Sequence, residues 1–576
     1  MEHTPRTITE IRLKSPTRPK SPPRVADVIA DELVNAGVDT LFMLPGGTIS
    51  PVLDACLDKP QIRQVGTRHE SGAMFAAAGY ARATDKLGVV CVTSGPGVLN
   101  TLTGLASAHC EGIPMLVLAG EIPRAKQGQM ALQDGSAHHL DILTMVKPVA
   151  KLALEITRPE AAPAILRRAV RTAMSGKRGP VVLTVPMDVA RCIVPEQRFF
   201  SEVALDYAIE GGMMGRALDE AAAALAAAVR PAILAGSGVR HGLGPERLQH
   251  LAERLQVPVL TTPKAKGLFP ESHPLSLGVF GHGGHPSSRE YLERGIDVLL
   301  AVGTSMSDTG TDGQSDLLRP TESLIHVDVD ALQLGRHYPV TLGIVGEADD
   351  ILRAMARRVA HVADTRRFGV RRHGDPEVEA YGPSGMITPQ RALWELQQVL
   401  PADTLYTCDI GEHLLFATHY LTIDPPGGFM AMNGLASMGS GLGAAIGAQL
   451  GSPERTVAAI CGDGTFAMHG AEVATASAEG LPIVFVVLDD RRFGMVENGH
   501  EALYGRTPPF STEPVNVRAL AEALGAHTTV IRKPGDILNA NLRSTHRPMV
   551  LDVQIDAAVR MPKNGRFEEL KRAAQE

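Results

Sequence analysis

The 576-residue sequence is poor in aromatic residues and has no excess of positive charge. Aromatic residues make up 4% of the chain and Trp394 is the single tryptophan, which leaves little surface for stacking on nucleic-acid bases. The formal net charge is −7, which also argues against a nucleic-acid partner. No apolar run reaches the roughly 20 residues that a membrane-spanning helix needs. The sequence therefore predicts a globular protein without nucleic-acid or membrane partners.

The sequence also has no cysteines with paired spacing, and its first residues do not show the pattern expected of a signal peptide. The six cysteines are scattered along the chain, which is not the pattern of a disulfide framework or of a metal site. They predict reduced thiols in a cytoplasmic protein. Residues 1–24 are rich in Pro, Arg, Lys, Ser and Thr and predict a disordered tail. This tail has no apolar core for a signal peptide, and Glu2 and Glu10 disfavour the alternative of a transit peptide.

What the sequence does contain is a strand, turn, helix and strand between Val457 and Asp490. The apolar run 457–461 ends in Gly462-Asp463-Gly464, the segment 468–479 is predicted to be a helix, and a second buried strand, 482–488, stops at Asp489-Asp490. In an open parallel sheet, ligands collect at the carboxyl ends of the strands. Backbone nitrogens at glycines and at the start of a helix can bind phosphate. A carboxylate beside phosphate repels it unless a cation such as Mg²⁺ lies between them. We therefore predict a metal and diphosphate site here, against the alternative of a plain β-α-β unit.

The spacing within this unit, together with motifs elsewhere, resembles the thiamine diphosphate (ThDP) enzymes. Gly-Asp-Gly, 24 further residues and a polar pair that closes a strand are similar to the ThDP signature. Further matches occur in chain order at Pro45-Gly46-Gly47, Arg68-His69-Glu70, Gly79-Tyr80-Ala81-Arg82, Thr93-Ser94-Gly95-Pro96-Gly97 and Gly120-Glu121-Ile122-Pro123-Arg124. Within the family, these segments resemble the acetolactate synthase large-subunit group.

Strand and helix patterns alternate along most of the chain, which predicts the α/β class with doubly wound parallel sheets. The resemblance implies three such domains in series. Their predicted ranges are 25–195 for a pyrimidine-binding domain, 209–362 for a central Rossmann-like domain and 387–562 for a diphosphate-binding domain, with a linker at 363–386 and a C-terminal tail at 563–576.

The resemblance also implies cofactor ligands in the third domain. The Mg²⁺ ligands would be the carboxylates of Asp463 and Asp490 and the backbone carbonyl of Arg492. The family most often has Asn-Asn where this chain has Asp489-Asp490, and we expect Arg491 and Arg492 to offset the added charge. Further predicted ThDP-binding residues are Pro45, Glu70, Ser437, Met438, Gly462, Gly464, Thr465 and Met495. Met438 would support the bent shape of the cofactor, with a core methionine as the alternative.

Four residues of the first domain are predicted to act in catalysis. Glu70 would share a proton with the aminopyrimidine ring of ThDP, because a buried carboxyl has a raised pKa. Its alternative role is to serve the helix dipole. By resemblance, Gly46 and Gly47 lie near the reacting carbon and Gln133 faces the substrate. Leu132 stands where the family has an aromatic residue.

The implied reaction is ThDP- and Mg²⁺-dependent decarboxylation of a 2-oxo acid, with pyruvate the expected substrate, and ligation of the enamine to a second carbonyl compound. A decarboxylase that does not ligate is an alternative, suggested by His138-His139, and so is a flavin-dependent oxidase. FAD stays open, because Arg240 and Gly281-His282-Gly283 match the family's flavin site only in part. A silent binding or regulatory relative is a further alternative.

Two more features follow from the resemblance. Gly499 occupies the position of a tryptophan that shapes the second-substrate pocket in anabolic members, so the acceptor is not identified. The protein is expected to be a homodimer or homotetramer with ThDP at the subunit interface, where Glu70 of one chain meets Asp463 of another.

Overall fold

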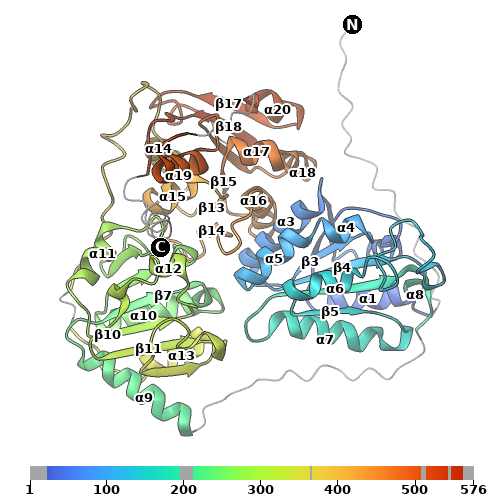
Figure 1. Cartoon of the computed structure of the whole chain (residues 1–576), viewed down its shortest axis with the longest axis horizontal. Helices are drawn as coiled ribbons and strands as arrows, with labels where there is room; N and C mark the ends of the chain where they lie inside the picture. Colours follow the sequence, from blue (N-terminus) through green and yellow to red (C-terminus); the bar gives the residue numbers. More distant parts are fainter. Residues whose placement is uncertain (1–21, 195–211, 364–365, 508–513, 543–545, 562–576) are drawn as a thin grey trace.

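The protein is described here by a computed structural model that covers residues 22–194, 212–363, 366–507, 514–542 and 546–561. It contains three six-stranded sheets that form three bodies along the chain, coloured blue to cyan, green to yellow and orange to red in Figure 1. Every strand pairing within the sheets is parallel. The predicted fold class, three doubly wound parallel-sheet domains, is confirmed.

The first and third sheets share one strand order. The first runs β2-β1-β3-β4-β6-β5 and the third β14-β13-β15-β16-β18-β17, which is the same order when strands are counted within each domain. The strands of the first sheet are β1 (Thr40–Met43), β2 (Arg63–Gly66), β3 (Gly88–Val92), β4 (Met115–Glu121), β5 (Leu152–Glu155) and β6 (Pro180–Pro186). Those of the third are β13 (Leu405–Cys408), β14 (Phe429–Ala431), β15 (Val457–Gly462), β16 (Val484–Asp489), β17 (His527–Ile531) and β18 (Met549–Gln554).

The central sheet has a different order, β12-β11-β10-β7-β8-β9, which is the Rossmann order 3-2-1-4-5-6 read in reverse. Its strands are β7 (Ala232–Ala235), β8 (Val259–Thr261), β9 (Ser276–Val279), β10 (Val298–Val302), β11 (Ser323–Asp328) and β12 (Leu342–Val345). In all three sheets the direction of winding reverses beside the first strand of the domain. Ligand sites are therefore expected at the carboxyl ends of β1, β7 and β13 and their neighbours.

Helices cover both faces of these sheets, which explains why inner strands such as β3, β4 and β6 are continuous runs of buried residues. The first domain has α1 (Val25–Asn35), α2 (Ser50–Leu57), α3 (Glu70–Thr84), α4 (Pro96–Leu99), α5 (Leu102–Glu111), α6 (Ile142–Val146), α7 (Ala162–Met174) and α8 (Met187–Arg191). The central domain has α9 (Gly212–Ala227), α10 (Gly244–Leu255), α11 (Pro286–Glu293), α12 (Asp308–Thr311) and α13 (Ala348–Ala356). The third has α14 (Pro389–Val399), α15 (Glu412–Tyr420), α16 (Ser440–Gly451), α17 (Asp463–His469), α18 (Val473–Ala478), α19 (Gly494–Tyr504) and α20 (Val517–Ala523). None of the helices that the structure describes is long and apolar enough to cross a membrane.

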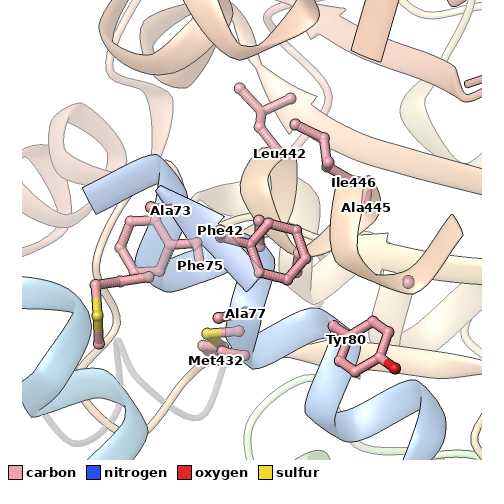
Figure 2. Packing of buried hydrophobic residues seen from close by; sticks show 14 of the residues in the cluster. Phe42, Ala73, Phe75, Ala77, Tyr80, Met432, Leu442, Ala445 and Ile446 are labelled. Atoms are coloured by element: carbon pink, nitrogen blue, oxygen red, sulfur yellow. The ribbon is translucent and has the colours of Figure 1, made fainter. Parts of the chain in front are cut away.

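The first and third domains of the chain share one hydrophobic core. Figure 2 shows Phe75 and Tyr80 of α3 packed with Leu442 and Ile446 of α16, and all four belong to one buried cluster. The two helices meet at glycines. A β-carbon on Gly447 would lie 2.5 Å from the Tyr80 backbone nitrogen and closer still to the backbone of the preceding turn of α3. This close approach fixes α3, whose first residue is Glu70, against the third domain.

Three predicted segments differ from what the structure shows or lie outside it. The expected helix 468–479 is divided into α17 and α18 by a 3-10 turn at Gly470–Glu472, and α17 begins at Asp463 itself. Most of the predicted tails fall outside the described residues, but Arg24 contacts Asp27 and Asp54. The described part of the linker 363–386 is tied to the third domain, since the Arg372 guanidinium donates to the carbonyl oxygen of His419 at 2.9 Å.

Candidate active site

A cavity of about 640 Å³ lies at the carboxyl edge of the third sheet. Most of its walls come from the segments that follow β13, β14, β15, β16 and β18. The central domain contributes Pro263, His282, Asp308 and Thr309. β13 and β15 are the neighbours between which the winding reverses. The cavity therefore occupies the position where an open α/β sheet binds ligands, and its size is typical of a small-molecule site.

The two predicted metal-ligating carboxylates line this cavity. Asp463 is the first residue of α17, directly after β15, and Asp490 follows β16. Burial, together with the charge of Asp490, raises the pKa of Asp463 to about 7. Burial also raises the pKa of Asp490 to about 6, although Arg492 opposes the shift. The two carboxylates are thus costly to ionise together, and a divalent cation between them would remove that cost.

The expected charge compensation comes from Arg492, whose Nε donates to Asp490 Oδ2 at 3.1 Å. The Arg491 side chain is exposed, and its backbone nitrogen donates to Asp489. Across the described ranges, no group of three or more His, Cys, Asp or Glu side chains is placed to hold a metal. A cation here would consequently take its remaining oxygens from backbone, water or the ligand's phosphates.

Asp409, at the end of β13, holds the cofactor-side loops in place. This fully buried carboxylate accepts hydrogen bonds from the backbone nitrogens of Gly439 and Gly441 and from the Thr465 hydroxyl, at 3.0, 2.7 and 2.9 Å. It thereby joins the turn that carries Met438 to the start of α17. Met438, Gly462, Gly464, Thr465 and Met495 all line the cavity, and their contact with a cofactor stays a prediction.

Sequence reasoning missed several polar residues of the cavity wall, three of which are Glu412, His413 and Asn433. Glu412 and His413 begin α15 directly after Asp409-Ile410-Gly411, and Asn433 precedes α16. The Glu412 Oε2 atom accepts from Asn498 Nδ2 at 2.6 Å, and burial raises the pKa of Glu412. The available signal was the position of Glu412 and His413, because β13 ends at the same sheet edge as β15.

Two of these residues provide a test of whether the cavity suits a polar cofactor. His413 Nε2 and Asn433 Oδ1 are buried and have no hydrogen-bond partner among the residues that the structure describes. Burial lowers the pKa of His413 to about 4, so the imidazole is neutral. Buried polar atoms are rarely left unpaired, and here they line a cavity beside a helix N-terminus. These residues, together with the acidic pair, fit a metal-bound diphosphate.

The predicted catalytic residues of the first domain gather at the carboxyl edge of their own sheet. Gly46 follows β1, and a β-carbon on it would lie 3.1 Å from Thr93 Cγ2, at the end of β3. The Thr93 hydroxyl donates to Gln133 Oε1 at 3.2 Å. Buried Glu70 begins α3 and accepts from Asn100 Nδ2 at 3.0 Å. The structure therefore brings Glu70, Gly46 and Gln133 to one region.

That region is separate from the cavity of the same chain. Among the described residues that line the cavity, none comes from the first domain, so Pro45, Gly46, Gly47, Glu70 and Gln133 do not reach it. The surface around Gln133 is partly apolar and open, since the Met130 and Leu132 side chains are 80% and 88% exposed. One chain thus presents two half-sites.

Four other residues singled out in the sequence lie elsewhere. Ser437 is hydrogen-bonded to the Ser107 hydroxyl at 2.8 Å and is not part of the cavity lining. Gly499 is buried in α19, also outside the lining. His138 and His139 are exposed on the loop of Gln133, and the Nδ1 atom of His139 is hydrogen-bonded to the carbonyl oxygen of Asp134.

The central domain has a second, smaller cavity at the carboxyl edge of its sheet. It measures about 130 Å³ and is lined in part by Ser237, Arg240, Thr304 and Asp328. The Arg240 guanidinium donates to the carbonyl oxygens of Ser237 and Lys264 at 2.9 and 3.0 Å. This volume is below the roughly 300 Å³ at the lower end of small-molecule sites. This cavity by itself is therefore smaller than a ligand of FAD's size needs, and FAD binding stays a prediction.

Comparison with known proteins assigns each domain. Models of thiamine pyrophosphate (that is, ThDP) enzymes match residues 23–142 as the N-terminal binding domain, 218–355 as the central domain and 409–553 as the C-terminal binding domain. The solved structure of a thiamine diphosphate-dependent 4-hydroxybenzoylformate decarboxylase from Rhodococcus jostii RHA1 matches at a TM-score of 0.81, with 93% of this chain and 100% of that chain covered. Its 24% identity shows the fold alone.

Sequence relatives refine this assignment. A probable acetolactate synthase large subunit of Methanocaldococcus jannaschii is 33% identical over 557 residues, which covers 93% of each chain. The acetolactate synthase large subunit of Corynebacterium glutamicum is 31% identical over 578 residues, with 95% of this chain and 89% of the relative covered. With three matching domains and relatives along almost the whole chain, the protein belongs to the thiamine diphosphate-dependent enzymes, in the acetolactate synthase large-subunit-like group.

Proposed function

We propose that the protein decarboxylates a 2-oxo acid, with pyruvate as the first candidate, and joins the product to a second carbonyl compound. The observation that carries this proposal is the pair of half-sites on one chain. The third domain offers an acidic cavity suited to a metal diphosphate. The first domain offers buried Glu70 and, on a loop with exposed apolar side chains, Gln133, both away from that cavity. The similarity to acetolactate synthases supports the ligation step.

The half-sites support a dimer as the active form. Glu70 and Asp463 would share one active site only if the first domain of one chain faced the third domain of another. The exposed apolar side chains of Met130 and Leu132 lie on the loop of Gln133, where such a contact would cover them. A homotetramer would contain the same pair of chains.

In the third domain, the chain's own groups would hold and orient the cofactor. The carboxylates of Asp463 and Asp490 and the carbonyl of Arg492 would hold Mg²⁺. The first turn of α17 would bind phosphate oxygens through backbone nitrogens, helped by the helix dipole. Met438 would pack beside the cofactor ring system. Bound thiamine diphosphate supplies an electron sink for cleavage of the bond to the carboxyl carbon.

In the first domain, Glu70 would exchange a proton with the ring nitrogen of the aminopyrimidine. Asn100 fixes one of its carboxyl oxygens at 3.0 Å, which leaves the other free to face the cofactor. Gln133 would bind the substrate, with its side chain oriented by the Thr93 hydroxyl. FAD is given no role in this mechanism.

The test is mass-resolved product analysis after incubation of the protein with pyruvate, ThDP and Mg²⁺, alone and with aldehyde or 2-oxo-acid acceptors. A 2-hydroxy ketone or acetolactate is the expected product. If acetaldehyde were the sole product, the protein would be a decarboxylase that does not ligate, and His138 and His139 would become the residues to test. Glu70→Gln is expected to lower turnover at least about a hundredfold. The control Glu322→Gln alters an exposed carboxylate of the central domain and should not change turnover. Full activity of Glu70→Gln would contradict the proposed mechanism.

A further inference from the structure

Glu472 is a buried carboxylate of the third domain that contacts the first domain of the same chain. It ends the 3-10 turn after α17 and is 2% exposed. Its Oε1 atom accepts hydrogen bonds from the backbone nitrogens of Arg68 and His69 at 3.1 and 3.0 Å. Its Oε2 atom accepts from the Thr475 hydroxyl at 2.7 Å. Both oxygens of this carboxylate are thus engaged.

The backbone that Glu472 binds leads directly into Glu70. His69 is the N-cap residue of α3, and Glu70 is the first residue of that helix. The nitrogens of Arg68 and His69 lie just outside the helix and have no carbonyl partner within it. A carboxylate at this position satisfies them and also interacts favourably with the helix dipole. The direction in which α3 starts, and hence the place of Glu70, depends on this contact.

The first turn of α3 leaves room for the carboxylate. A β-carbon on Gly72 would lie 2.5 Å from the Glu472 Cδ atom, so only glycine leaves room at this position of α3. Asn100 donates to the Oε2 atom of Glu70. The backbone just before Glu70 is therefore held by the third domain, and the Glu70 carboxyl group by the first.

We propose that Glu472 is a positioning residue for Glu70, one that acts from the third domain of the same chain. The inference rests on the proposed function, because it takes Glu70 to be the group that activates the cofactor. Glu472 itself is not proposed to touch cofactor or substrate. Its contribution is to keep the Arg68-His69 backbone, and so the Glu70 carboxyl, in one orientation.

The test compares three variants in the full-length protein. Glu472→Met removes the acceptor while keeping an unbranched side chain, and Glu472→Gln keeps one acceptor oxygen without the charge. Glu479→Gln is the matched control, because Glu479 also joins the third domain to the first, through an ion pair at 2.6 Å with Arg63 of β2.

The first readout needs no cofactor. Backbone amide exchange of Arg68 and His69, measured by deuterium uptake, is expected to speed up at least about tenfold in Glu472→Met. In Glu472→Gln, the loss of charge assistance is expected to give about a fivefold increase. Glu479→Gln should match the wild type. Unchanged exchange of both amides in the Gln and Met variants would overturn the inference, and the Gln variant alone suffices if the Met variant does not fold.

The second readout is the rate at which bound ThDP exchanges its reactive ring proton for deuterium, followed by NMR. Both Glu472 variants should slow this exchange and lower kcat by similar factors, while the KM for the 2-oxo acid stays within about twofold. A wild-type exchange rate in Glu472→Met would overturn the inference. If Glu70→Gln also exchanged at the wild-type rate, the proposed function would fail instead, and the amide exchange would still test the contact itself.

Discussion

Gly447→Ala tests whether the first and third domains depend on direct backbone contact between α3 and α16. The added β-carbon would lie 2.5 Å from the Tyr80 nitrogen and 2.8 Å from the Ala76 carbonyl carbon. Non-bonded heavy atoms prefer about 3.5 Å or more, and the Ala76 carbonyl oxygen would lie closer still, so the helices would have to separate by more than about 1 Å. Separation would also loosen the packing of Phe75 and Leu442 in the shared core.

The expected change in the free energy of unfolding is the sum of two opposing contributions. Overpacking in a core costs about 1–3 kcal/mol, and the upper end applies here because backbone atoms cannot rotate away. Alanine gains about 1 kcal/mol over glycine in helix propensity. We therefore expect Gly447→Ala to lower the free energy of unfolding by about 2 kcal/mol. Turnover should fall by a larger factor than stability alone would explain, because a shift of α3 also moves Glu70, its first residue.

The assay is urea unfolding followed by circular dichroism, together with turnover. The control is Gly215→Ala in α9, where no atom lies within 4 Å of the added β-carbon, so this variant should be slightly more stable than the wild type. Equal stabilities of the Gly447→Ala variant and the wild type would refute the view that these helices meet at backbone distance.

Three further predictions concern buried charges. Burial raises the pKa of Glu121 from 4.5 to about 7, so the folded state holds the proton more tightly and stability falls as pH rises from about 4.5 to 7. Between pH 5 and pH 8, the stability of Glu121→Gln relative to the wild type should therefore rise by on the order of 2 kcal/mol in thermal unfolding. A stability difference between the two proteins that stays constant over this pH range would contradict the prediction. Glu271→Gln removes the charge that pairs with fully buried Lys266 at 2.6 Å and should cost about 3 kcal/mol in urea unfolding, whereas a loss below about 1 kcal/mol would show that the ammonium finds other compensation. Asp490→Ala should weaken Mg²⁺-dependent ThDP binding at least about tenfold in calorimetry, and unchanged affinity would remove Asp490 from the metal site.

The local pattern of residues was enough to place most elements and the acidic loop. α14 is an element of this kind, because the capping hydroxyl of Thr388 and the apolar periodicity that follows it are local properties. The predicted strands 457–461 and 482–488 are β15 and β16, since runs buried on both faces are continuously apolar. The division of the helix after Asp463 was missed, because Gly470 allows the chain to tighten into a 3-10 turn that apolar periodicity does not reveal.

The sequence by itself determined the α/β class, the motif that carries Asp463 and Asp490, and the identity of Glu70 as a candidate acid. Only the tertiary structure decided which of these groups share a cavity and which do not. Glu412 and His413 became part of the site because β13 lies next to β15, a neighbour relation set by sheet order. Glu472 reached the backbone before Glu70 for a similar reason, since α3 and α16 pack at their glycines. Contacts between residues hundreds of positions apart depend on how sheets and helices pack, and local residue patterns do not encode that packing.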